Sequence, residues 1–163
     1  MLEQWHSFTD SDAFRRVTTR GPGRAFLRSQ TFRSLNLARN NVRTRAAIAR
    51  HPGTFDDVKT FCFFVGHNKS GASLLGGLLD AHPDVLLSDE VDALQYVDAG
   101  FACEQVYQMI LKGSQAEARK GRITARRLVP YSYWVPGGWQ GRCRTPLVVG
   151  DSTTGTSTRR IAA

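Results

Sequence analysis

The stretch "FFVGHNKSGASLLGGLLDAHPDVLLSDE", residues 63–90, decides the fold class of this 163-residue chain. An aromatic, apolar run ends at Gly66, and a short segment rich in glycine and serine follows it. Leucines then recur in the i, i+1, i+4, i+5 pattern of a helix with one buried face, at Leu74, Leu75, Leu78 and Leu79. A second apolar run, "DVLLS", begins after Pro83. The stretch therefore predicts a strand, a loop, a helix and a second strand.

Two neighbouring segments extend this pattern. "DALQYVDAGFACEQVYQMILKG", residues 92–113, predicts one amphipathic helix, and "PLVVGD" predicts a third buried strand that ends at Asp151. The apolar positions of the helix include Leu94, Val97, Phe101, Val106 and Ile110. The order β-α-β-α-β predicts an α/β fold with a parallel sheet of about three strands.

The chain divides by composition into an N-terminal extension and a main domain. Residues 1–55 predict a basic, partly helical extension, and residues 56–163 predict the α/β domain. The helical part, "LRSQTFRSLNLARNNVRTRAAIARH", alternates arginines with an imperfect apolar stripe. One interpretation is an organellar presequence or a helix for an anionic surface. The other, which we favour, is a solvated helix that packs on the domain by one face.

The net charge of +8 is unevenly distributed. Residues 1–60 hold 11 basic and five acidic residues (+6), residues 61–111 hold one and seven (−6), and residues 112–163 hold ten and two (+8). Because the segment with the clearest strand and helix patterns is acidic, we expect no nucleic-acid partner.

Other gross features narrow the class of protein further. No apolar run approaches the length of about 20 residues that a membrane span needs. The first residues lack a basic segment followed by an apolar one, so we expect a cytoplasmic protein. The three cysteines are widely spaced, which predicts reduced thiols and no zinc site.

The loop before the leucine-rich helix has the composition of an anion site. Gly66 and Gly71 have the spacing of the phosphate-binding pattern G-x-x-x-x-G-K-[ST], but Ala72 occupies the lysine position and Lys69 precedes the second glycine. Unpaired N–H groups at a helix start favour bound anions. A lysine displaced from the helix start would reach the outer edge of such an anion, near a bond that breaks. The alternative is a tight turn in which Ser70 or Ser73 caps the helix.

The segment "NKSGASLLGGLLDAHPDVLLSDE" closely resembles the 5'-phosphosulfate-binding segment of sulfotransferases that use 3'-phosphoadenosine 5'-phosphosulfate (PAPS). It is most similar to the tyrosylprotein-sulfotransferase-like branch, over residues 61–97. The resemblance implies a P-loop-containing nucleotide-binding-like fold, here truncated after about three strands. It also implies transfer of a sulfuryl group from PAPS to a hydroxyl or amine of a small-molecule, glycan or peptide acceptor, without a metal.

The resemblance also implies roles for particular residues. Lys69 matches the basic residue that stabilises the leaving phosphate oxygen, and Glu90 matches the general base. The loop that wraps the 5'-phosphate matches Lys69, Ser70, Gly71, Ala72 and Ser73, where Ala72 replaces the usual threonine. Asp89, next to Glu90, is the alternative base. If the first two strands are neighbours about 4.8 Å apart, Lys69 and Glu90 emerge at the same carboxyl edge of the sheet.

Several other residues are weaker candidates. We expect His82 to make structural hydrogen bonds, whereas His67 lies in the loop and either touches the ligand or forms the turn. Asp151 ends the third predicted strand at a place where some sulfotransferases have a G-D-K element, although Ser152 replaces the lysine. Two tryptophans in a Pro/Gly-rich segment either cover an acceptor site or pack locally, namely Trp134 and Trp139.

One expected element of the family is missing from the sequence. Sulfotransferases hold the 3'-phosphate with an arginine and a serine in an R-x-P-x-[DE]-x-x-x-S-type stretch, and no such stretch occurs here. The alternatives to an active enzyme are therefore a truncated, non-catalytic remnant of a sulfotransferase and, less favoured because of Ala72, a P-loop kinase or NTPase. No motif identifies the acceptor or the oligomeric state.

Overall fold

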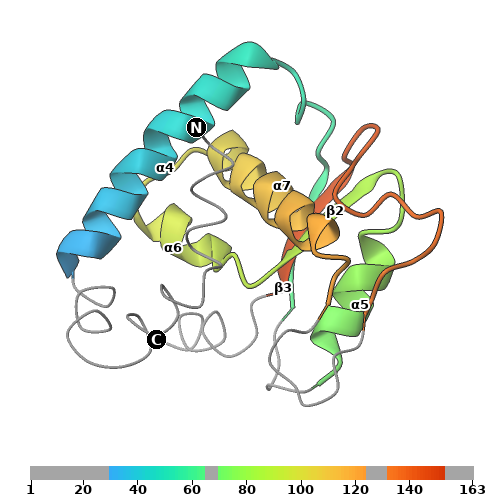
Figure 1. The fold of residues 1–163 in the computed structure, drawn as a ribbon. Helices are drawn as coiled ribbons and strands as arrows, with labels where there is room; N and C mark the ends of the chain where they lie inside the picture. The colour runs from blue at the N-terminus through green and yellow to red at the C-terminus, as the bar shows by residue number, and fades with distance from the viewer. Residues whose placement is uncertain (1–29, 65–69, 124–131, 153–163) are drawn as a thin grey trace, which may run out of the picture. The chain divides into compact units, whose positions relative to one another are not determined.

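The computed structural model describes residues 30–64, 70–123 and 132–152 (Figure 1). The chain forms two compact units, residues 1–40 and 41–163. Helix α4 (Gln30–Arg50) begins in the first unit and ends in the second. The second unit therefore takes in residues 41–55, which the sequence assigns to the N-terminal extension. The strands and helices α5, α6 and α7 all belong to this second unit.

A parallel sheet of three strands forms the centre of the second unit. The strands are β1 (Thr60–Phe63), β2 (Val85–Asp89) and β3 (Val148–Ser152), in the order β1-β3-β2. The prediction of an α/β fold with a small parallel sheet is confirmed. The prediction that the first two strands are neighbours is wrong, because β3 lies between them and separates them by about 9.6 Å, two strand spacings. Burial agrees with this order, since β3 is almost wholly buried and β1 is not.

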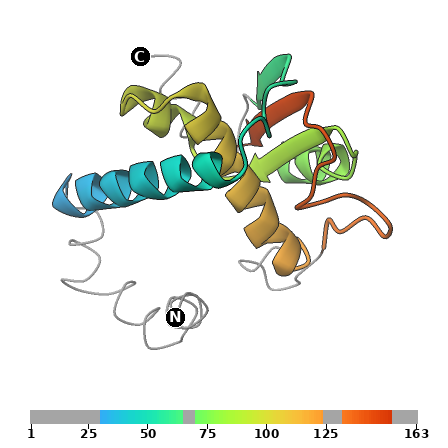
Figure 2. The same ribbon diagram turned by 90° about the horizontal axis from the view of Figure 1, so that it is seen from above.

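Helices cover the two faces of this sheet (Figure 2). Helix α5 (Ala72–Leu79) approaches the face that carries Leu87, since a Cβ built on Gly76 would lie 3.4 Å from Leu87 Cδ2. Helix α7 (Cys103–Arg119) approaches the face that carries Ser88, because a Cβ built on Gly113 would lie 3.0 Å from Ser88 Cβ. Successive residues of a strand point to opposite faces, so the two helices lie on opposite sides of β2.

Helix α5 packs by its glycines and not by its leucines. Its buried residues are Gly76 and Gly77. The leucines predicted to be buried are 48%, 47%, 53% and 38% exposed, in the order Leu74, Leu75, Leu78 and Leu79. The prediction of a buried leucine face is therefore wrong, although the predicted helix is present. The physical reason is close approach: the residues without a Cβ let the helix backbone lie directly against the strands.

The predicted helix of residues 92–113 is divided in two. Helix α6 (Ala93–Asp98) ends before Gly100, whose φ of +77° favours glycine and breaks the helix, and α7 begins at Cys103. Val97 is 53% exposed, contrary to its predicted place on a buried face. Three of the other predicted apolar positions are buried, namely Phe101, Val106 and Ile110. The buried apolar residues are Phe55, Leu86, Leu87, Ala93, Tyr96, Phe101, Val106, Ile110 and Val149.

The part of α4 that lies in the second unit makes a polar contact with α7. Thr44 is fully buried, and its hydroxyl accepts a hydrogen bond of 3.0 Å from Gln105 Nε2. The apolar Val42 is 69% exposed. Ile48, another position of the predicted apolar stripe, is half-buried, so this part of the helix packs by a threonine and by part of the stripe.

The outer edge of β2 is closed by side chains. The Leu87 N–H donates a hydrogen bond of 2.7 Å to Asp80 Oδ1, and the Leu87 carbonyl accepts one of 3.0 Å from Arg122 Nη2. Asp80 directly follows α5, and Arg122 follows α7. The two residues form a buried ion pair through Asp80 Oδ2 and Arg122 Nη2. This pair satisfies backbone groups that an edge strand would otherwise leave open.

Candidate functional site

The N-terminus of α5 lies beyond the carboxyl end of β1, where sheets of this type bind ligands. Gly71 is the N-cap residue, with φ of +83°, and no side chain makes a capping hydrogen bond there. The first turn contains no acidic residue. Ser70 and Gly71 are exposed, while Ala72 and Ser73 are half-buried. The backbone N–H groups of this turn, without a side-chain cap, favour an anion.

The basic residue of the predicted loop lies outside the described residues. Lys69 belongs to residues 65–69, as do Gly66 and His67. Of the five residues assigned to the donor, the structure therefore places four. These four form the bend and first helical turn that the sequence predicts.

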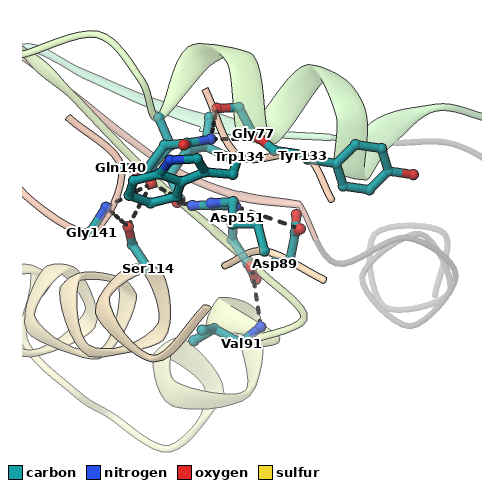
Figure 3. Close-up of polar contacts among 12 residues, drawn as sticks. Gly77, Asp89, Val91, Ser114, Tyr133, Trp134, Gln140, Gly141 and Asp151 are labelled. Carbon is teal, nitrogen blue, oxygen red and sulfur yellow. Dashed lines mark hydrogen bonds and ion pairs between the residues drawn. The ribbon is translucent and has the colours of Figure 1, made fainter. Parts of the chain in front are cut away.

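Glu90 lies just after β2, in a loop held by Asp151. Glu90 has a positive φ of 57° and an exposed side chain. The carboxylate of Asp151 accepts hydrogen bonds from the N–H groups of Val91, at 3.3 Å, and Ala93, at 2.7 Å. Asp151 is fully buried, so it shapes the loop next to Glu90 and does not line an open site (Figure 3).

Asp89, the last residue of β2, lies on the α5 side of the sheet. A Cβ built on Gly76 would lie 3.2 Å from Asp89 Oδ1, and the Asp89 side chain is 17% exposed. Burial raises the pKa of this carboxyl to about 6, although the nearby Arg122 guanidinium opposes the shift. A carboxylate with a pKa near neutral is suited to accepting a proton. Of the two candidate bases, Asp89 is the one whose pKa is raised by burial, and Glu90 is the one whose side chain is exposed.

A buried polar cluster beside Asp89 was not foreseen from the sequence. Asp80 is fully buried, and its carboxylate accepts hydrogen bonds from Ser114 Oγ, at 2.7 Å, and the Gly141 N–H, at 3.1 Å. Burial raises the pKa of Asp80, while Arg122 and the hydrogen bonds lower it. Arg122 is one of ten basic residues after position 111, and no local pattern distinguishes it from the others.

A second part of the cluster fixes the irregular segment after residue 131. Gln140 is buried, and its Nε2 donates to the carbonyls of Gly77, at 2.7 Å, and Tyr133, at 2.8 Å. Its Oε1 accepts from the Val135 N–H at 2.8 Å (Figure 3). This segment is thus bonded to α5, which explains how a glycine- and proline-rich stretch packs without helices or strands of its own.

The structure also describes the three remaining candidates, His82, Trp134 and Trp139. His82 Nδ1 accepts a hydrogen bond of 3.2 Å from the Asp84 N–H, in agreement with the predicted structural role. The backbone N–H of Trp139 donates to the carbonyl of Ala81, just after the C-terminal end of α5. The Arg142 Cζ lies over the Trp139 ring, 5.4 Å from its centroid. Trp139 therefore packs locally. Trp134 is 42% exposed, and its N–H donates to Ser132 Oγ at 3.0 Å.

Two tests for other kinds of site give negative results within the described residues. No group of three or more His, Cys, Asp and Glu side chains there has an arrangement that would hold a metal ion. Within residues 30–64, 70–123 and 132–152, no helix is both long and apolar enough to cross a membrane.

Comparisons with known proteins assign no family to the chain. No protein-family model matches its sequence, and the searches of curated proteins and of solved structures gave no significant match.

Proposed function

We propose that the chain is a sulfotransferase domain that binds the 5'-phosphosulfate of PAPS at the start of α5. One observation carries the proposal: the described parts of the region that resembles the family include a strand, β1, and a helix, α5, whose first turn has no side-chain cap. Two carboxylates, Asp89 at the end of β2 and Glu90 just after it, lie at the same edge of the sheet. Anion binding and proton acceptance, the two requirements of the reaction, are thus supported at one edge.

The proposed reaction is an in-line displacement at sulfur. The acceptor oxygen or nitrogen forms a bond to sulfur, the bond between sulfur and the bridging phosphate oxygen breaks, and adenosine 3',5'-bisphosphate leaves. The acceptor's proton goes to a carboxylate at the end of β2, either Glu90, as the resemblance implies, or Asp89. Lys69 stabilises the negative charge that develops on the bridging oxygen.

Titration calorimetry with adenosine 3',5'-bisphosphate tests donor binding. We expect micromolar affinity for the unaltered chain, and a loss of roughly ten- to a hundredfold in Lys69→Ala, because a charge-assisted contact to phosphate is removed. Lys59→Ala is the matched control, since Lys59 directly precedes β1 and so lies at the amino ends of the strands. No binding at millimolar ligand would refute the proposal and favour a non-catalytic remnant. Tighter binding of ATP with magnesium would favour an NTPase.

The base is identified by the release of adenosine 3',5'-bisphosphate from PAPS, including release by transfer to water. We expect Lys69→Ala to abolish release. We expect either Asp89→Asn or Glu90→Gln to bind the bisphosphate normally and to lose turnover. If both variants retain the rate of the unaltered chain, neither carboxylate is the base, and the proposed reaction is wrong.

A further inference from the structure

The guanidinium of Arg122 contacts two carboxylates, those of Asp80 and Asp89, in different ways. Its Nη2 bonds directly to Asp80 Oδ2 and donates to the Leu87 carbonyl. Its Nη1 lies 3.7 Å from Asp89 Oδ2, which is within ion-pair range and beyond a hydrogen bond. Arg122 therefore holds Asp80 by a charge-assisted hydrogen bond and acts on Asp89 by charge, without a hydrogen bond.

The Arg122 side chain has little freedom to leave this position. Its side chain is 2% exposed, and Asp80 is itself fixed by donors from β2, α7 and the segment after residue 131, namely Leu87, Ser114 and Gly141. The backbone of Arg122 also depends on these contacts, because the residue has a positive φ of 48° in the turn that follows α7. That conformation is unfavourable for a non-glycine residue, so the tertiary contacts must stabilise it.

Among the described residues, one cation shifts the pKa of Asp89. Burial raises the pKa of Asp89 most, Arg122 and a hydrogen bond with Ser152 lower it, and Glu117 of α7 and the adjacent Glu90 raise it. Helix α5, which packs against Asp89, contains no ionisable side chain. Arg122 is therefore the basic residue that acts on Asp89 among the described groups, and it acts against desolvation and two acidic neighbours.

We propose that Arg122 is a positioning residue for Asp89: anchored by Asp80 and the Leu87 carbonyl, it holds the Asp89 carboxylate at the carboxyl edge of the sheet as the proton acceptor. This inference rests on the proposed function for the identity of the reaction. It assigns the base to Asp89 in preference to Glu90. A direct hydrogen bond from Arg122 would weaken Asp89 as a base, and the absence of any cation would leave it protonated at neutral pH.

Carbon-13 NMR of the aspartate carboxyls tests the inference without an activity assay. The informative variant is Asp80→Asn with Arg122→Gln, which removes the cation without leaving a buried carboxylate unpaired. We expect the titration midpoint of Asp89, assigned by its loss in Asp89→Asn, to rise by about 1–3 pH units. An unchanged or lower midpoint would overturn the inference.

Further variants separate the effect of Arg122 from general changes in charge or folding. Arg144→Gln removes an arginine that pairs with Asp84 at the surface, with a side chain 66% exposed, and should leave the Asp89 midpoint unchanged. If the double variant does not fold, Arg122→Lys replaces it. We expect a smaller rise of the Asp89 midpoint, because lysine has a single nitrogen and cannot bond to Asp80 and face Asp89 with two separate nitrogens. An unmoved midpoint in a folded Arg122→Lys protein would also overturn the inference. Calorimetry with the bisphosphate tests the proposed function separately.

Discussion

Helices α5 and α7 cover opposite faces of one sheet, and each brings a glycine close to β2, but they differ in the side chains that they bury beside it. Helix α7 presents large side chains to the core, and Ile110 is fully buried. Helix α5 presents Gly76 and Gly77, and Leu78 on its far side is 53% exposed. Leucine spacing thus reveals that a helix forms, but not which face is buried, because a surface without Cβ atoms can approach a sheet more closely than a leucine can.

The largest difference between the two helices should appear on truncation of their aliphatic side chains. Ile110→Ala should reduce the free energy of unfolding by about 2–5 kcal/mol, because it leaves a cavity in the core. Leu78→Ala, the matched substitution on α5, should change it by no more than about 0.5 kcal/mol. Urea denaturation measures both values. Equal losses would mean that the leucines of α5 are covered in solution, and the comparison would fail.

A second prediction concerns Asp89, which lies beside α5. The folded protein binds the Asp89 proton more tightly than the unfolded chain, so the ionised carboxylate lowers stability above about pH 6, and this cost disappears as the pH falls toward 4. Asp89→Asn should therefore stabilise the protein by up to about 3 kcal/mol at pH 7.5.

Thermal or urea unfolding between pH 4 and 8 measures this gain. It should shrink toward zero at pH 4, because the unaltered Asp89 is then protonated in the folded state. Asp84→Asn is the surface control, since its partner Arg144 is exposed. A pH-independent effect of Asp89→Asn would show that its cause is packing and not ionisation.

The smallest effects are expected from adding single methyl groups to the two helices. A Cβ at Gly113 of α7 would lie 2.5 Å from Val91 Cγ2, and overpacking of this kind typically costs about 1–3 kcal/mol. A Cβ at Gly76 of α5 would lie no closer than 3.2 Å to its neighbours. Because alanine favours a helix by about 1 kcal/mol over glycine, Gly76→Ala should be nearly neutral. A greater loss in Gly76→Ala than in Gly113→Ala, measured by urea denaturation, would contradict the described packing.

The strands were the most predictable part of the fold. Short, continuous apolar runs located β1, β2 and β3, and their alternation with helices indicated a parallel sheet. The order of the strands was not predictable from these runs. A buried strand has the same kind of sequence whichever other strand lies beside it in the sheet. The placement of β3 between β1 and β2 depends on how the crossovers pack.

The candidate site was predictable only where its residues are close in sequence. The turn at Gly71 and the acids at the end of β2 were found because they adjoin apolar runs. Asp80, Ser114, Arg122 and Gly141 come together through contacts between residues far apart in sequence. Their spacing follows no helix or strand period, so nothing local indicates that these four residues meet.

The ion pair between Asp80 and Arg122 has a consequence for how this protein meets other polypeptides. An endless sheet that runs through many molecules needs two open strand edges on each of them. The edge of β2 already donates and accepts through Leu87, with a carboxylate and a guanidinium as its partners. Another strand could pair along this edge only by breaking the buried contacts at Leu87, which opposes growth of the sheet through β2.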